Sequence, residues 1–374
     1  MRFLILFFCL IFIFADLQKS VAQEPLKTIT ADTVVEKTTN KFFVRSFPIV
    51  YIRPETGWGG GLAGTTNFSL NGRNEKTPAS QVSWVMSYTE KKQFLVLLPF
   101  NLYFKNRKYY SEGELDVTNF SWDYWGNGNI TKDVSEKFYT NYKRLIFNLM
   151  TKVYGKIYGG LKTEMNDFPE LRFGDINGQL ATNTSIAGRN GGFYKSIGTE
   201  FLYDTRDNIY SAKKGMMVDV TYLYWNKVFF GDATFHRIFI DAMKFNSLTK
   251  WDVLCFDLNL QMNNGVEVPF TELSQLGGST IMRGLYEGRY RDKFLANICV
   301  ENRIHIYNRF GLVVFGNLGE VNNSITNFDF NYLRWTVGSG VRYLLNSSDR
   351  INVRFDFAVG PNTHGSYLTI GEAF

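Results

Sequence analysis

Apolar and polar residues alternate with a period of two along most of the chain. Residues 351–359, INVRFDFAV, place Ile, Val, Phe, Phe and Val on one side and Asn, Arg, Asp and Ala on the other. Residues 81–89 and 252–263 alternate in the same way. Because successive side chains of a β-strand point to opposite faces, each stretch predicts a strand with one apolar face and one polar face.

This alternation predicts about sixteen strands. The expected strands span 47–54, 58–69, 81–89, 93–104, 109–119, 141–154, 156–165, 194–205, 215–225, 234–248, 252–263, 294–307, 310–320, 332–345, 351–360 and 366–374. Short turns are expected at 155–156, 308–309 and 346–349, and long loops at 120–140, 166–193, 264–293 and 321–331. An N-terminus on the inner side of a membrane would place all four long loops on the outer side, as in outer-membrane barrels.

Three details favour a membrane barrel over a large secreted β-sandwich, which would also alternate. The polar faces carry charges, as where Arg354 and Asp356 share one face. The strands approach the roughly 9–11 residues that cross a bilayer at a tilt, and aromatic residues gather near strand ends at 102–110 and 221–230. Backbone groups in lipid must all be hydrogen-bonded, so the sheet has to close. The predicted fold is an all-β, 16-stranded antiparallel transmembrane β-barrel.

Composition and charge narrow the alternatives. The chain has 374 residues, of which 17% are aromatic, and a formal net charge of +6. Its mean hydropathy is slightly negative, which excludes a bundle of membrane helices. The basic residues are scattered rather than gathered in blocks, so we expect no nucleic-acid groove. The length suits one large barrel or two ordinary soluble domains.

Residues 1–22 have the features of a secretory signal peptide. Arg2 supplies a positive start, and residues 3–15 form an apolar run that is too short to span a bilayer. A short membrane anchor is the alternative. Residues 23–44 are polar and predict a periplasmic linker, which leaves residues 45–374 for the barrel.

Five segments of the C-terminal half stand out as a set. They are GTEFLYDTRDNIYSAKKG (198–215), GGSTIMRGLYEGRYRD (277–292), VVFGNLGEV (313–321), VGSGVRYLL (337–345) and RFDFAVG (354–360). In this order, and with a final Phe374, they resemble the BamA/TamA outer-membrane assembly superfamily, also called bacterial surface antigens. The N-terminal half matches only in its strand pattern. The resemblance implies a 16-stranded barrel, the same number that the alternation predicts.

The resemblance also implies a role for an arginine in the long loop after the eleventh strand. In the family this extracellular loop inserts into the lumen, where its Arg-Gly pair, here Arg283 and Gly284, docks on inward-facing acids of the next two strands. Glu301 and Asn317 hold the inward positions here. Because Asn317 carries no charge, either the docking is weaker or Asp257 shares the role. An arginine fork suits a carboxylate because two N–H groups donate in parallel. A solvated loop arginine is the alternative.

A charged motif, YDTRDN, is expected at an inner turn. Asp204, Arg206 and Asp207 are short-range neighbours of opposite sign. We expect them to pair locally and with neighbouring turns, in a structural role.

The closing segment SYLTIGEAF is expected to be the last strand. Alternation puts Leu368, Ile370 and Phe374 on its lipid-facing side, with Glu372 as an exception. A C-terminal aromatic residue on a lipid-facing strand resembles the signal by which such barrels are recognised for insertion.

The sequence offers little catalytic chemistry. Its three histidines are scattered without metal-ligand spacing, and no glycine-rich phosphate loop precedes a helix, so we expect neither a metal nor a cofactor. His364 and Ser366 are similar to the His-x-Ser pair of lipid A deacylase barrels, which leaves a lipid-modifying enzyme as a second alternative. Cys255 and Cys299 are expected on neighbouring strands at offset heights, which argues against a disulfide bond between them; a bonded pair is the alternative.

A weak seam is expected between the first and last strands. Pro48 and Pro54 limit hydrogen bonding at the ends of the first strand. Gly365 and Gly371 leave few side-chain contacts in the last one. Such a seam could open laterally or distort the bilayer.

The resemblance implies a part in outer-membrane biogenesis, as insertion or translocation of proteins or lipids. Family members that assemble other proteins carry periplasmic capture domains before the barrel, and the linker at 23–44 is too short for one. We therefore expect a barrel-only, non-enzymatic member in the bacterial outer membrane, working with lipid and other envelope proteins in a larger complex. A plugged passive pore or a structural barrel is the main alternative.

Overall fold

The structure, a computed structural model, describes residues 43–68, 80–105, 108–131, 133–174, 186–229, 231–346 and 350–374. The signal peptide expected at 1–22 and residues 23–42 of the expected linker lie outside the described residues. No helix in the described ranges is both long enough and apolar enough to cross a membrane.

β-Strands make up nearly all of the described regular structure. They are β1 (Phe43–Arg53), β2 (Gly57–Phe68), β3 (Ser80–Thr89), β4 (Phe94–Phe104), β5 (Tyr109–Tyr124), β6 (Glu136–Tyr154), β7 (Ile157–Phe168), β8 (Leu171–Gly174), β9 (Gly192–Asp204), β10 (Gly215–Trp225), β11 (Phe235–Ser247), β12 (Asp252–Asn264), β13 (Ser274–Leu276), β14 (Tyr290–Asp292), β15 (Phe294–Tyr307), β16 (Phe310–Asn322), β17 (Arg334–Asn346), β18 (Ile351–Gly360) and β19 (Thr363–Ile370). Four short 3-10 helices lie in the connections: η1 (Lys227–Phe229), η2 (Phe270–Glu272), η3 (Ile325–Asn327) and η4 (Phe330–Tyr332).

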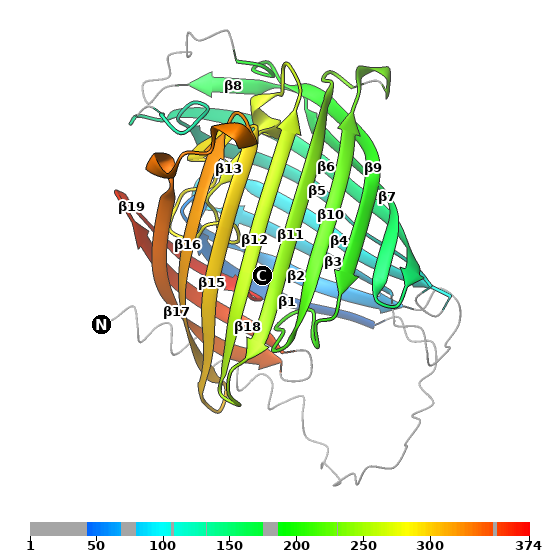
Figure 1. Cartoon of the computed structure of the whole chain (residues 1–374), viewed down its shortest axis with the longest axis vertical. Coiled ribbons are helices and arrows are strands. Elements are labelled where there is room, and N and C mark those ends of the chain that lie inside the picture. Colours follow the sequence, from blue (N-terminus) through cyan, green and yellow to red (C-terminus); the bar gives the residue numbers. More distant parts are fainter. Residues whose placement is uncertain are drawn as a thin grey trace. The chain divides into compact units, whose positions relative to one another are not determined.

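Sixteen of these strands close into one antiparallel barrel, which confirms the predicted fold (Figure 1). Each strand pairs with its neighbour along the chain, except that β7 pairs with β9 and β12 with β15. The short β8 pairs with β6 beyond the end of β7, and β13 and β14 form a separate hairpin. β1 pairs with β19 and closes the ring.

The two faces of the strands have opposite chemistry. On β15 and β16 the outward Ile298, Val300 and Val314 are 38–56% exposed. The inward Glu301 and Phe315 are at most 3% exposed. Exposed apolar side chains on consecutive strands form the band that a barrel presents to lipid, and the charged side encloses the lumen.

The described parts of the four long connections lie at one end of the barrel (Figure 1) and differ in detail from the expected loops. β5 and β6 continue past the predicted strand ends, so the loop expected at 120–140 shortens to 125–135. The loop expected at 166–193 contains β8, which the sequence pattern missed. Buried aromatic residues pack at this end, among them Phe138, Phe173, Trp225, Phe235 and Phe270. This packing lets the strands extend beyond the length that crosses lipid.

The seam that closes the barrel has far less pairing than the ladders beside it. β1 and β19 share one register pair, Ile52 with Leu368, whereas β1 and β2 share eleven and β18 and β19 share eight. The last strand ends at Ile370, before Gly371, whose φ is +93°. Among the described residues, positions 43–51 of β1 therefore have no register partner on the seam side.

Candidate functional site

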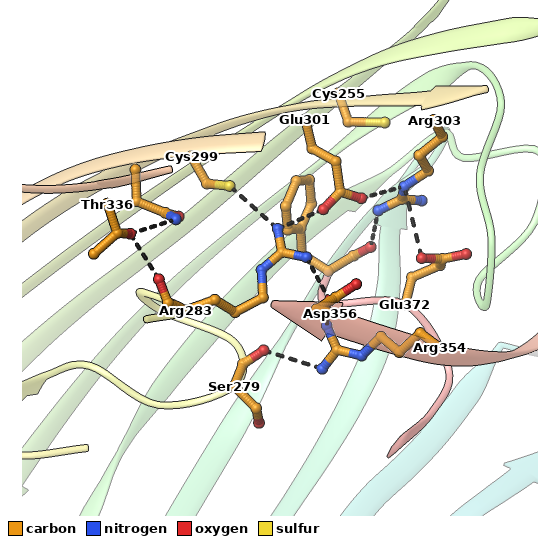
Figure 2. Close-up of polar contacts among 12 residues, drawn as sticks. Cys255, Ser279, Arg283, Cys299, Glu301, Arg303, Thr336, Arg354, Asp356 and Glu372 are labelled. Atoms are coloured by element: carbon orange, nitrogen blue, oxygen red, sulfur yellow. Dashed lines mark hydrogen bonds and ion pairs between the residues drawn. The ribbon is translucent and has the colours of Figure 1, made fainter. Parts of the chain in front are cut away.

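The loop between β12 and β15 folds back into the barrel and brings Arg283 to its inner wall (Figure 2). Arg283 is 1% exposed. Its guanidinium donates from Nη1 to Asp356 Oδ2 at 2.8 Å and from Nη2 to Glu301 Oε2 at 2.5 Å. The guanidinium carbon lies 3.4 Å from the ring centroid of Phe315. Two carboxylates and an aromatic face therefore fix one side chain of the loop.

Gly284 lets the loop backbone approach the wall closely. Its φ is +98°, a conformation that side chains other than glycine disfavour, and a Cβ there would lie 3.0 Å from the Cβ of Ala358. Its N–H donates to Tyr367 Oη at 2.9 Å, and its carbonyl accepts from Thr363 Oγ1 at 2.6 Å. The residue after the arginine is thus held against the last two strands.

The docking position expected on β16, Asn317, does not bind the guanidinium of Arg283: the described hydrogen bonds of that guanidinium to carboxylates go to Asp356 and Glu301. Asn317 Nδ2 donates to Thr336 Oγ1 at 3.0 Å, and Thr336 Oγ1 donates to the carbonyl of Arg283 at 2.6 Å. An aspartate could not donate this hydrogen bond, so the amide suits its actual partner. Asn317 supports the backbone of the loop through Thr336.

Asp257 is not a partner of Arg283 either. It lies on β12 opposite Cys299 in the register and accepts a hydrogen bond from Asn259 Nδ2 at 3.4 Å. The second carboxylate is instead Asp356 on β18. The loop tip extends past β16 and β17 to β18. The expectation considered only the two strands that follow the loop, so it missed this partner.

Arg283 belongs to a larger charged cluster, which we call the lock network. Its members are Arg283, Glu301, Arg303, Arg342, Arg354, Asp356 and Glu372. Their side chains are at most 8% exposed. Glu301 also accepts from Arg303 Nε at 2.7 Å, and Asp356 also accepts from Arg342 and Arg354. Arg354 returns to the loop by donating to the carbonyl of Ser279 at 3.0 Å. Buried charges of both signs thus compensate one another across β15, β17, β18 and the loop.

The C-terminal segment turns into the lumen, so the lipid-facing position expected for Phe374 is wrong. The chain leaves β19 at Gly371, and Glu372 accepts from Arg342 Nε at 2.8 Å. The backbone oxygen of Phe374 accepts from Arg303 Nη2 at 2.8 Å, and its ring packs 6.3 Å from that of Phe245. The inward turn explains why Glu372 breaks the alternation: its carboxylate pairs with the buried Arg342 inside the barrel.

A second contact holds the loop near its start. Glu272, in η2, receives hydrogen bonds from Arg237 Nη2 at 2.9 Å and from Asn166 Nδ2 at 2.8 Å. Phe270 packs among the buried aromatic residues of the same barrel end. These residues lie on β7, β11 and the loop, and no spacing in the sequence connects them.

The tip of the loop contacts both flanks of the seam. On the β19 flank, Tyr367 and Thr363 hold Gly284. On the β1 flank, the backbone N–H of Glu287 donates to Glu55 Oε1 at 2.8 Å. Glu55 lies in the turn between β1 and β2 and is 2% exposed. The loop tip therefore connects two strands that share only one register pair with each other.

The charged motif at the inner turn pairs within itself and with another turn. Arg206 Nη2 donates to Asp204 Oδ2 at 2.8 Å, and Arg350 Nη1 donates to Asp207 Oδ2 at 2.6 Å. Partial burial by itself would raise the pKa of Asp207, but hydrogen bonds from Arg350 and from two backbone N–H groups lower it. The motif thus joins the β9–β10 turn to the β17–β18 turn.

Other candidate chemistry is sparse. His364 and Ser366 occupy alternate positions of β19, and in the described ranges no hydrogen bond joins them. Cys255 and Cys299 are both buried and free. Within the same ranges no group of three or more His, Cys, Asp or Glu residues could hold a metal ion.

Comparison with known proteins identifies a family and similar structures. A family model described as the Omp85 superfamily domain matches residues 60–374. No curated protein matches the chain. Among solved structures, the chain is similar to BamA from Haemophilus ducreyi lacking POTRA domains 1–3, with 13% identity and a TM-score of 0.60. That match covers 90% of this chain and 71% of the other.

Two further structures, CdiB from Acinetobacter baumannii and CdiB from Escherichia coli, are similar at 11% and 10% identity, with TM-scores of 0.54 and 0.59. They match 88% and 89% of this chain, which spans 60% and 64% of theirs. At these identities the three structures show a shared fold.

Proposed function

Since the chain belongs to the Omp85 superfamily and is a bacterial outer-membrane barrel, we propose that it takes part in outer-membrane biogenesis. In this proposal the barrel inserts or translocates proteins or lipids as a subunit of a larger complex. The observation that carries the proposal is the seam, where a single register pair joins β1 to β19.

A seam of this kind opens at lower cost than the ladders beside it. Each backbone group left unpaired in lipid costs several kcal/mol, so a ladder of eight or eleven register pairs resists separation far more than one pair does. Opening would expose the edge of β1 to the bilayer, where a strand of another protein could pair with it. Pro48 lacks an N–H and sits within this edge, which limits how far β1 can pair with any partner strand.

The lock network supports the same function by confining movement to the seam. Arg283 and its carboxylate partners connect the loop to β15 and β18, and Glu372 connects the segment after β19 to Arg342 on β17. The wall from β15 to β18 is therefore braced from inside. The β1 flank contacts the loop through Glu55, which makes it the freer side of the seam.

Locking the seam tests the proposal. A disulfide between cysteines introduced by Ile52→Cys and Leu368→Cys would fix the one register pair, while Ile298→Cys with Leu318→Cys would lock a regular ladder as the matched control. The native cysteines are buried, so an oxidant reaches the introduced pairs first. Cells whose only copy has a locked seam should lose outer-membrane protein or lipid, whereas the control should not. Normal envelope composition with a locked seam would refute the proposal.

A plugged passive pore is the second candidate, because the loop between β12 and β15 occupies the lumen. Conductance in planar bilayers separates the two. A pore should conduct more when Arg283→Ala releases the loop, with no change in envelope composition. Recovery of the intact barrel in mild detergent, followed by identification of co-purifying envelope proteins, tests the proposed complex.

A further inference from the structure

Glu55 sits at the point where the loop tip reaches the β1 side of the seam. One of its carboxylate oxygens, Oε1, accepts the backbone N–H of Glu287 at 2.8 Å. The other, Oε2, is buried and has no hydrogen-bond partner among the described residues. This hydrogen bond joins the loop tip to the β1–β2 turn. Its acceptor is a carboxyl group that can gain or lose a proton.

The surroundings disfavour a charge on Glu55. Within the described ranges no ion pair joins its carboxylate to a cation, although the charges of Arg53 on β1 and Lys91 in the β3–β4 turn are close enough to interact with it. Lys91 Nζ donates instead to the carbonyl of Pro54 at 2.8 Å. The carboxylate of Glu287 faces it from the loop. A buried carboxylate with a second carboxylate nearby and no salt-bridge partner is stabilised by taking up a proton.

The remaining neighbours of Glu55 are uncharged near neutral pH. Tyr286 faces it from the loop and Tyr367 from β19. Gln93, on the β3–β4 side, donates to its backbone carbonyl at 3.4 Å. None of these three side chains supplies a charge, so the charges at the site are those of Glu55, Glu287, Arg53 and Lys91.

We propose that the carboxyl group of Glu55 is a proton-controlled latch, which holds the loop tip across the seam when protonated and releases it when ionised. The loop tip is fixed to the β19 flank through Tyr367 and Thr363, so losing the Glu55 contact leaves the single Ile52–Leu368 register pair to join the two flanks. The latch regulates the seam opening on which the proposed function rests. Its chemistry requires no cofactor and no second protein.

The sign follows from the pKa. Burial, and then the Glu287 carboxylate, raise the pKa of Glu55 to about 7 from the 4.5 of a solvated glutamate. The hydrogen bond from the Glu287 N–H and the charge of Arg53 lower this pKa, but burial outweighs both of them. A raised pKa in the closed state stabilises that state fully below the solvated value, and the stabilisation is lost as the pH rises through about 7. One pKa unit is a tenfold change in the equilibrium, so the ratio of open to closed seam should rise roughly 100-fold between pH 5 and pH 9.

Distance measurements across the seam test the latch directly. Extending the Ile52–Leu368 register places Val50 opposite Ile370, and both side chains are exposed on the lipid-facing side. Spin labels on V50C and I370C, in nanodiscs, report the seam width by pulsed electron resonance. The unmodified latch should give a short distance at pH 5 and a growing long-distance population as the pH rises through about 7. A width that does not change with pH would overturn the proposal.

Variants distinguish the latch from a general effect of pH. Glu55→Gln keeps the acceptor oxygen without the charge and should stay closed from pH 5 to pH 9. Glu287→Gln removes the neighbouring charge and should move the transition to lower pH. Glu90→Gln changes an exposed acid of the neighbouring turn, which accepts from the backbone N–H of Trp58 at 3.2 Å, and should behave like the parent. A seam width that still increases with pH in Glu55→Gln would refute the latch. The locked-seam experiment in cells tests the biogenesis role independently.

Discussion

Neutralising Asp356 should destabilise the barrel more than removing Arg283 does, although Arg283 is the residue that anchors the loop. Asp356 accepts from three arginines, Arg283, Arg342 and Arg354. In Asp356→Asn these guanidiniums lose their shared carboxylate and remain buried. Removing one partner of a buried ion pair costs about 3–5 kcal/mol, and we expect the upper part of this range.

Arg283→Ala is milder because its former partners keep other cations. Glu301 retains Arg303, and Asp356 retains its two remaining arginines. The lock network then holds three arginines and three carboxylates, so no carboxylate is left without a cation. We expect about 3 kcal/mol, from two lost charge-assisted hydrogen bonds and the contact with Phe315.

Arg289→Ala is the matched control from the same loop. Arg289 lies over the rings of Trp125 and Tyr290, at 4.9 and 4.8 Å from their centroids, and is only partly buried. Cation–π contacts at such sites contribute about 0.5–1 kcal/mol each, and Arg289 Nη1 also donates to Thr131 Oγ1. Because Arg289 is partly exposed, its loss should cost less than the loss of the two buried carboxylate hydrogen bonds of Arg283. The expected order of destabilisation is Asp356→Asn, then Arg283→Ala, then Arg289→Ala.

Urea unfolding of the refolded barrel in detergent, followed by the band shift between unheated and heated gel samples, measures this order. With a slope of about 2–3 kcal/mol per molar urea, a loss of 3 kcal/mol lowers the midpoint by about 1 M or more. If Arg283→Ala and Arg289→Ala share one midpoint, the loop is not docked. If Asp356→Asn is milder than Arg283→Ala, the charge balance of the lock network is wrong.

Three further changes probe the site. Gly284→Ala should lose about 1–3 kcal/mol in the same urea assay, because a side chain strains the positive φ and meets the wall; Gly126→Ala has a similar φ and open space, and should lose less. Glu372→Gln should lower the temperature at which the gel band shifts, and an unchanged temperature would mean that the inward turn does not stabilise the barrel. Asp207→Asn breaks the pair with Arg350, which is partly exposed, and a double-mutant cycle in urea should give at most about 1 kcal/mol.

The barrel could be predicted from the sequence because alternation is a local signal with a direct physical cause. A strand that separates lipid from a polar lumen must alternate along its whole length, so the sixteen strands appear one by one. β8 escaped prediction because its four residues are too few to show a period. The ends of β5 and β6 were also missed, since aromatic packing at the barrel end, rather than lipid, sustains them there.

The charged site could be predicted only in part because its contacts cross the lumen. Alternation places Glu301 inward, and the resemblance brings Arg283 to it. Nothing local shows that the loop tip reaches Asp356 on β18 instead of Asn317 on β16. Which strand of the wall the loop tip reaches depends on how far the loop extends, and the strand pattern carries no information on that distance.

The position of Phe374, which the sequence pattern predicted wrongly, changes how the seam is understood. A lipid-facing C-terminus would continue β19 and add register pairs to β1, which would strengthen the seam. Gly371 instead ends the strand, and Arg303 and Arg342 draw the last residues into the lumen. The register that pairs Ile52 with Leu368 would place residues 371–374 opposite positions 49–46 of β1. The arginines that brace the β15–β18 wall therefore also leave this part of β1 without a partner strand. A variant that releases this segment, such as Glu372→Gln, should therefore do two opposite things: weaken the wall and allow β19 to lengthen along β1. Disulfide formation between cysteines introduced at Val50 and Ile370 would rise in such a variant, and no change would show that the inward turn does not limit the seam.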